Sequence, residues 1–179
     1  MDTQIFNLQR KVLRYKEVLQ QTDIYRQTWK DSLKKEIMDQ LTQLAEASGL
    51  EGQVEERGDL ENLEAVVFTL GSARSGMFQQ VNDDFQRDLV KYNGALVYQQ
   101  LFNGKIVVLV QYPFIEGYSE PKQPKQIAIY RPAELQAPFF IRHLETFITE
   151  ITHWEDYDDD EPAQRIGFQR NFAPQTDES

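Results

Sequence analysis

The sequence predicts an α+β fold: a long N-terminal helix or helix pair, an antiparallel sheet with a central hairpin, a helix after the first long strand, and a long C-terminal helix. Three observations predict it: an apolar stripe with helical spacing over residues 4–47, short β-branched runs between turn residues in the middle, and a second helical stripe from residue 133. The expected division is a helical region over residues 1–48, an α+β core domain over 49–156, and an acidic, polar tail over 157–179.

The N-terminal stripe repeats at three- and four-residue steps, which place its members on one face of a helix. Thr22 can cap a second helix, so one long helix and a pair both stay open, and Gly49 supplies a stop signal. The stripe can pack on the chain's own sheet. Its length also favours a second copy or another protein along part of it. Its members are Ile5, Leu8, Val12, Tyr15, Leu19, Tyr25, Trp29, Leu33, Ile37, Leu41 and Leu44.

Residue types predict the elements over residues 49–92. Residues 49–61 hold three glycines and five acidic residues and predict a loop or a short edge strand, and residues 63–70 predict a buried strand. Residues 78–92 predict a helix, because their large apolar side chains fall at helical steps. A strand over 85–92 is the alternative, because Asn93-Gly94 is also a hairpin signal.

Asn103-Gly104 predicts a hairpin between residues 95–102 and 105–112. A two-residue turn would pair Phe102 with Lys105, which puts Ala95 and Val97 on the core face and Tyr98 and Leu109 together on the opposite face. That opposite face is half apolar, so helices of the same chain or a partner should cover part of it. A further strand is expected over residues 126–130 and a closing helix from residue 133 that ends by Trp154.

Composition narrows the class of protein. The chain has 179 residues, a net charge of −10 and no cysteine, which excludes disulfides, thiol nucleophiles and thiolate metal ligands. No segment supplies the basic face that nucleic-acid binding needs. The longest aliphatic run, Ile106–Val110, is far shorter than the roughly 20 residues that span a bilayer. With no basic and apolar leader at the start, we expect a cytoplasmic protein without membrane insertion.

The hexapeptide GSARSG has the glycine spacing of a phosphate-binding loop. The lysine and hydroxyl residue that would follow are replaced by Met77 and Phe78, so nucleotide hydrolysis lacks its principal groups. Two interpretations remain: a simple strand-to-helix corner, or a loop that binds a small anion at a helix N-terminus. The residues of such an anion site would be Gly71, Ser72, Arg74, Ser75 and Gly76.

No other segment predicts catalysis, a metal or a cofactor. His143 and His153 would stand about 15 Å apart on the closing helix and could not share a metal, so core or surface positions are expected. The acidic run 155–161 matches the start of a calcium loop, but Glu161 and Gly167 stand where that loop needs glycine and glutamate.

The sequence therefore predicts a non-enzymatic protein–protein interaction module: an adaptor, a chaperone-like factor or a subunit of a larger cytoplasmic assembly. Its partner would be another protein or a second copy. The alternative is a regulatory domain that binds a small anion or ligand at Gly71–Gly76. The predicted contact residues are Trp29, Leu33, Ile37, Tyr98, Leu109, Phe168 and Phe172.

Overall fold

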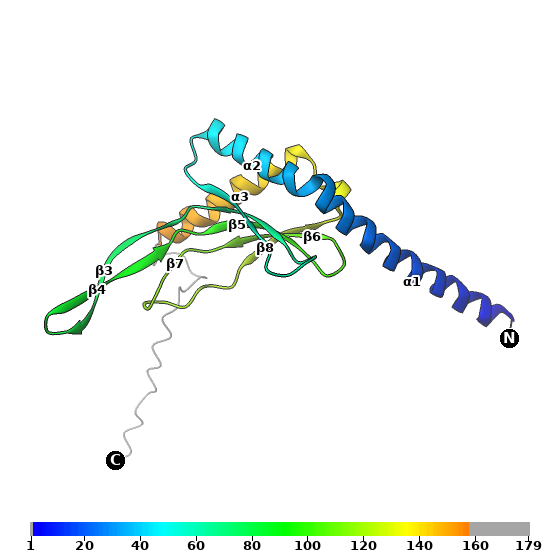
Figure 1. Ribbon diagram of the computed structural model, residues 1–179, viewed down its shortest axis with the longest axis horizontal. Coiled ribbons are helices and arrows are strands. Elements are labelled where there is room, and N and C mark those ends of the chain that lie inside the picture. The colour runs from blue at the N-terminus through cyan, green and yellow to red at the C-terminus, as the bar shows by residue number, and fades with distance from the viewer. Residues whose placement is uncertain (1, 158–179) are drawn as a thin grey trace, which may run out of the picture.

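A computed structural model describes residues 2–157. It shows an antiparallel sheet with two helices on one face, a long N-terminal helix that projects from one end, and a two-stranded arm at the other end (Figure 1). The predicted α+β class, with its long N-terminal helix, antiparallel hairpin and C-terminal helix, is confirmed.

The helices are α1 (Asp2–Thr28), a π-helical turn (Trp29–Leu33), α2 (Lys34–Ser48), a 3-10 turn (Pro132–Glu134) and α3 (Ala137–Glu155). The strands are β1 (Gln53–Arg57), β2 (Ala65–Thr69), β3 (Ser72–Asn82), β4 (Phe85–Tyr92), β5 (Ala95–Gln100), β6 (Ile106–Gln111), β7 (Phe114–Ile115) and β8 (Lys125–Tyr130). No helix within residues 2–157 carries an apolar stretch long enough to cross a membrane.

Residues 2–48 form one uninterrupted helical run, so the single long helix is correct and the pair is not. Thr22 does not cap a new helix, because its hydroxyl donates to the Val18 carbonyl of the preceding turn (3.2 Å). Gly49 ends the run as expected. Its φ of 70° is left-handed, and the N–H groups of Gly49 and Leu50 donate to the last carbonyls of α2.

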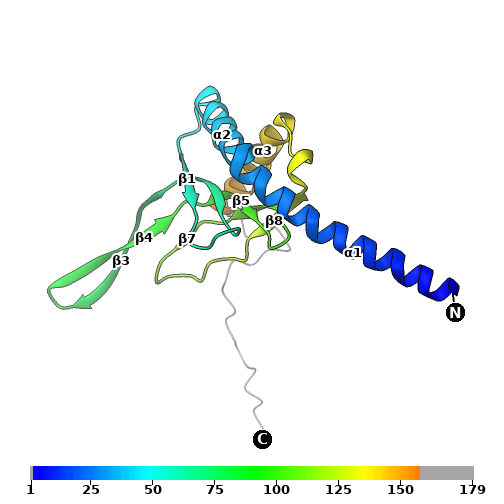
Figure 2. The ribbon, with the colours of Figure 1, turned by 45° about the vertical axis from the view of Figure 1, so that its right-hand side comes forward.

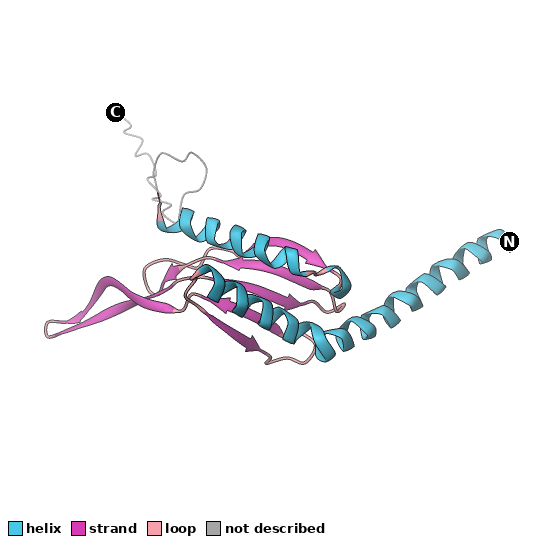
Figure 3. Cartoon of the chain, turned by 90° about the horizontal axis from the view of Figure 1, so that it is seen from above, coloured by secondary structure: helices cyan, strands magenta, loops and turns pink. Residues whose placement is uncertain are grey.

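The main sheet has the order β1-β2-β5-β6-β8, and all neighbours are antiparallel. Helices α2 and α3 lie side by side on one of its faces (Figure 3). The core between helices and sheet is mostly apolar, and its buried polar residues include Gln100 and His143. Its largest members are Trp29, Ile37, Leu41, Phe68, Leu96, Tyr98, Ile106, Phe140 and Phe147.

The β5–β6 connection has a three-residue loop, whereas the sequence predicted two residues. The Leu101 N–H donates to the Lys105 carbonyl (2.8 Å), which leaves residues 102–104 as the loop. Gly104 takes a φ of 76°, as the last residue of such a loop requires. The extra residue shifts the register of the two strands by one position.

This shift changes which side chains share a face, because neighbouring strand residues point to opposite sides. Tyr98 lies opposite Val108 on the helix-covered face, where its ring packs on Phe140 of α3. Leu109 lies opposite Val97 on the other face. The prediction that Tyr98 and Leu109 share a face is therefore wrong.

The predicted helix over residues 78–92 is also wrong. Residues 72–92 form the β3–β4 hairpin, which turns at Asp83-Asp84, and the base of β4 pairs with β7 (Figure 2). The alternative strand over 85–92 is correct. The apolar residues at helical steps instead lie along the arm, where Phe78 and Phe85 remain exposed.

Candidate functional site

The first candidate surface is the projecting part of α1. Residues 3–21 are all exposed, and this part of the helix extends away from the sheet (Figures 1 and 2). Nine large apolar side chains on α1 keep between 41 and 63% of their surface accessible. They are Ile5, Phe6, Leu8, Val12, Leu13, Tyr15, Val18, Leu19 and Ile24.

Five of these side chains form a continuous seam. Ile5, Leu8, Val12, Tyr15 and Leu19, here called the α1 seam, follow alternating steps of three and four residues. This is the heptad spacing with which one helix packs along another in a coiled coil. The seam therefore has the geometry of a helix-binding surface.

The last turns of α1 are held by the rest of the molecule. Arg26 donates from Nη2 to the Phe102 carbonyl (2.8 Å) in the β5–β6 loop. Gly104 in the same loop lies so close that a Cβ there would stand 2.7 Å from the Cβ of Tyr25. Trp29 is fully buried, and its indole N–H donates to Glu64 (2.9 Å). These contacts anchor the helix from about residue 22 onward. In the turns just before them, Arg14, Val18 and Gln21 line a shallow cavity together with Asn103, Lys105 and Arg131.

Lysines flank the α1 seam on both sides. In heptad terms the seam residues are the a and d positions, which puts Lys11 at g and Lys16 at e. These are the positions that face the charged side chains of a partner helix. The projecting part of α1 is thus basic, although the whole chain carries a net charge of −10.

Four of the predicted contact residues lie in the core instead. Trp29 and Ile37 have no exposed surface, Leu33 keeps 2%, and Tyr98 is fully buried. This corrects their assignment to a partner surface: they hold α1, α2 and α3 on the sheet. Leu109 is half-buried on the open face of the sheet. Phe168 and Phe172 lie outside the described residues.

The second candidate surface is the sheet face opposite α2 and α3, here called the open face. Ala65, Val67, Ala95 and Val97 form a small apolar cluster on it, and Leu109 packs against the cluster. These four side chains are only 0–4% exposed, although no helix within residues 2–157 packs on this side (Figure 3).

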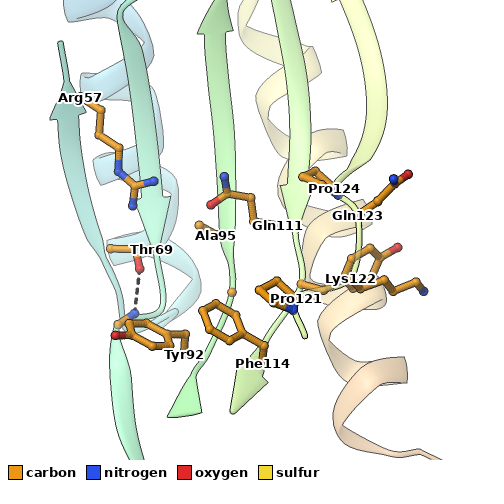
Figure 4. A pocket seen from close by; sticks show the side chains of 13 residues that line it. Arg57, Thr69, Tyr92, Ala95, Gln111, Phe114, Pro121, Lys122, Gln123 and Pro124 are labelled. Carbon is orange, nitrogen blue, oxygen red and sulfur yellow. Dashed lines mark hydrogen bonds between the residues drawn. The ribbon is translucent and has the colours of Figure 1, made fainter. Parts of the chain in front are cut away.

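A pocket of about 490 Å³ opens on the open face where β3 and β4 leave the sheet (Figure 4). Its lining includes small residues, Thr69, Gly71, Gly94 and Ala95. A pocket can form here because the side chains at these positions are short. The Thr69 hydroxyl is already used, since it accepts from the Gly71 N–H (3.0 Å).

Aromatic and cationic side chains wall the pocket. Tyr92 and Phe114 stack with ring centroids 4.7 Å apart. Lys122 holds its ammonium 4.2 Å from the ring centroid of Tyr112, in cation–π geometry. Arg57 extends over the other side from β1 (Figure 4). Such a lining suits a ligand that combines carboxylates with an apolar body.

The predicted anion loop joins two strands rather than a strand and a helix. Gly71, with a φ of 75°, lies between β2 and β3, and Gly76, with a φ of 76°, lies at a bulge within β3. Ser75 is engaged, because its hydroxyl accepts from the Met77 N–H (3.0 Å). Arg74 is 87% exposed and pairs with Asp88 (3.5 Å). The strand-to-helix corner is wrong. Anion binding at this loop stays a prediction, but the helix N-terminus that was expected to contribute to it is replaced by strand β3.

His143 is a core residue with both ring nitrogens engaged. It is 3% exposed and lies between two tyrosines: Nδ1 is 2.9 Å from the Tyr98 hydroxyl, and Nε2 is 2.9 Å from the Tyr130 hydroxyl. Burial lowers the pKa of His143 to about 4, so the ring is neutral at pH 7 and one tyrosine donates while the other accepts. His153 is exposed on α3.

A second hydrogen-bonded network ties α3 to the rim of the pocket. Glu150 accepts from the Tyr112 hydroxyl (2.6 Å) and from the Lys125 ammonium. Burial opposes ionisation of Glu150, but these two hydrogen bonds outweigh it and leave its pKa below the ordinary value. Burial and the bond to Glu150 raise the pKa of Tyr112. The arrangement fixes Tyr112, which in turn positions Lys122.

Within residues 2–157, no three histidine or acidic side chains come together in a way that could hold a metal ion. Comparison with protein-family models, with curated proteins and with solved structures finds no match. The α1 seam and the open face are therefore the surfaces from which a function can be inferred.

The sequence predicted the apolar stripe over residues 4–47. It did not predict that the first part of this stripe, the α1 seam, is exposed while the second part is buried. Both parts show the same helical spacing. They differ only in that the first part extends beyond the sheet, which a local pattern does not reveal. The pocket was missed altogether. Its lining comes from segments between residues 57 and 124 that only the sheet topology brings together.

Proposed function

We propose that this protein is a non-enzymatic interaction module that binds another protein through the α1 seam, as an adaptor, a chaperone-like factor or a subunit of a larger assembly. The observation that carries the proposal is the row of exposed apolar side chains along a helix that extends beyond its own core.

The energetics of an isolated helix support the proposal. Helices gain most of their stability in proteins from packing an apolar face, and isolated helices shorter than about 12–15 residues are marginal in water. Residues 3–21 are all exposed, and their large apolar side chains keep between 41 and 63% of their surface accessible. A partner helix on the seam would supply this packing, and full burial of one Leu or Val contributes about 1.5–3 kcal/mol.

The flanking lysines indicate the chemistry of the partner. In a parallel pair of two α1 helices, Lys11 of one copy would face Lys16 of the other, which places like charges together. A partner helix with glutamate or aspartate at its own e and g positions would instead pair with both lysines. We therefore favour an acidic, amphipathic helix as the occupant of the seam.

A charge-matched pair of variants tests the proposal. Leu8→Glu with Val12→Glu places two carboxylates in the seam, whereas Asn7→Glu with Gln21→Glu places two on the polar face. Proteins captured by the unmodified chain from its source cells should also bind the polar-face variant. The seam variant should lose them by at least about 100-fold in affinity, which corresponds to about 3 kcal/mol.

Circular dichroism of both variants checks that the helix content is kept. Equal capture by the two variants would contradict the proposal, because the seam would then be irrelevant to binding. If capture is lost and sedimentation of the pure chain shows dimers that only the seam variant abolishes, the partner is a second copy.

A further inference from the structure

The pocket on the open face lies where the two sheets of the molecule meet. The main-sheet strands β2 and β5 adjoin β3 and β4 of the arm there, and backbone hydrogen bonds join the two connections. The Leu70 N–H donates to the Gly94 carbonyl (3.1 Å), and the Asn93 N–H donates to the Gly71 carbonyl (3.0 Å). Small-molecule sites commonly occupy clefts between structural units, and a volume of about 490 Å³ is in their usual range.

Short side chains leave this volume open. Thr69, Ala95 and Gln111 lie in one cross-strand row, because Ala95 is the pairing partner of Thr69 on β2 and of Gln111 on β6. Residues in such a row share a face of the sheet, and all three line the pocket. Gly71, from the predicted anion loop, lines it as well and adds no side chain. A ligand therefore meets a shallow floor rather than bulky side chains.

Two aromatic rings form an apolar wall at one end of the pocket (Figure 4). Tyr92, the last residue of β4, stacks on Phe114 of β7 with ring centroids 4.7 Å apart and an interplanar angle of 19°. Tyr92 keeps 41% of its surface accessible, so the chain leaves part of the stacked pair uncovered. A flat apolar ligand can pack against such rings in the offset or edge-on geometries that aromatic pairs prefer.

Arg57 supplies a positive charge at the other end of the pocket (Figure 4). Its ion pair with Glu55 is 3.8 Å long and half-exposed on both sides, so the pair contributes little and a ligand can replace it. Lys122 lies on the ring of Tyr112 and forms part of the wall. The lining that residues 2–157 provide contains no carboxylate. A guanidinium in such a site favours a carboxylate, which it binds through two parallel hydrogen bonds.

We infer that this pocket binds a small molecule with one carboxylate and a flat apolar body, such as an aryl carboxylate. The carboxylate pairs with Arg57, and the apolar body lies over Thr69 and Ala95 against the rings of Tyr92 and Phe114. This site is separate from the α1 seam and is independent of a protein partner there.

The probe is 2-naphthoate, and 2-naphthamide is its uncharged counterpart. Isothermal titration calorimetry of the full chain should show naphthoate binding, with naphthamide weaker by at least about tenfold because it lacks the charge. Arg57→Gln should weaken naphthoate binding by at least about tenfold, which corresponds to about 1.4 kcal/mol. Arg87→Gln removes the same charge from the exposed arm and should leave the affinity unchanged.

Ala95→Leu tests the shape of the pocket independently of charge. The larger side chain extends into the pocket and should abolish naphthoate binding, whereas Ala73→Leu on the exposed arm should not affect it. Melting temperatures without the probe show whether both variants fold. If Ala95→Leu does not fold, Arg57→Gln still tests the site, because Arg57 is an exposed residue of an edge strand.

No binding of naphthoate up to about 5 mM would overturn the inference. Equal affinities of the Arg57→Gln and Arg87→Gln chains would also overturn it. So would loss of binding in the seam variant Leu8→Glu with Val12→Glu, since the probe would then lie on α1.

Discussion

His143 is the residue whose chemistry is most constrained by its surroundings. Its two ring nitrogens form hydrogen bonds with the hydroxyls of Tyr98 and Tyr130. A single side chain therefore joins the central strand β5, the edge strand β8 and α3. A neutral imidazole can serve both hydroxyls, because it has one donor and one acceptor. A charged imidazolium could not accept from either.

We predict that stability depends on pH through His143. Its pKa of about 4 in the folded chain lies below the ordinary 6.5, so the unfolded chain binds more protons between these values and stability falls as pH decreases. The free energy of unfolding should be about 2 kcal/mol lower at pH 5 than at pH 7.5 from this group. Urea denaturation across this range measures it.

His143→Gln is the control, since glutamine can donate and accept but does not titrate. Its stability should be nearly flat over the interval in which the unmodified chain loses about 2 kcal/mol. An identical pH dependence in both chains would show that other groups are responsible.

For single residues, the sequence predicted the kind of position better than the hydrogen-bond partners. A core position for His143 was among the expectations, because no local pattern offered it a metal or a nucleophile. Its two tyrosine partners are 45 and 13 positions away, and no local pattern encodes such pairs.

Among the elements, the β5–β6 loop decides both the register of the sheet and the anchorage of α1. The sequence predicted the hairpin from Asn103-Gly104, but the same dipeptide fits loops of two or three residues. The choice of three residues depends on the contact of the loop with α1, which a local pattern does not contain. The arm formed by β3 and β4 was missed for a similar reason, since its apolar side chains also fit helical steps.

Gly104→Ala should lower the stability of the fold by more than the backbone cost of placing a side chain at a left-handed φ. Its φ of 76° disfavours any side chain, and a Cβ would also stand 2.7 Å from the Cβ of Tyr25 and 3.0 Å from the Thr22 carbonyl oxygen. We expect the free energy of unfolding to fall by more than about 2 kcal/mol, because the variant combines backbone strain with displacement of α1. Thermal or chemical unfolding gives the value.

Gly49→Ala is the matched control. Gly49 has a similar φ of 70° but nothing within 4 Å of an added Cβ, so it reports the backbone cost alone, about 1 kcal/mol. Equal losses for the two variants would mean that the contact between the loop and α1 contributes nothing.

At the scale of the whole molecule, a sheet with two covering helices carries one arm at each end (Figure 1). The α1 arm exposes a seam with lysines at its flanks, and the β3–β4 arm exposes Phe78, Val81 and Phe85. The overall class was predictable from composition and periodicity. The projection of the arms was not, because an exposed apolar stripe and a buried one look alike in a single sequence.

If the α1 seam is a surface for another protein, a partner should lie against it in the cell. A photo-cross-linking amino acid placed at Val12, in the seam, and at Arg10, on the polar face, tests this directly in source cells. We expect discrete protein adducts from position 12 and few or none from position 10. Adducts absent from position 12, or equal at both positions, would contradict it.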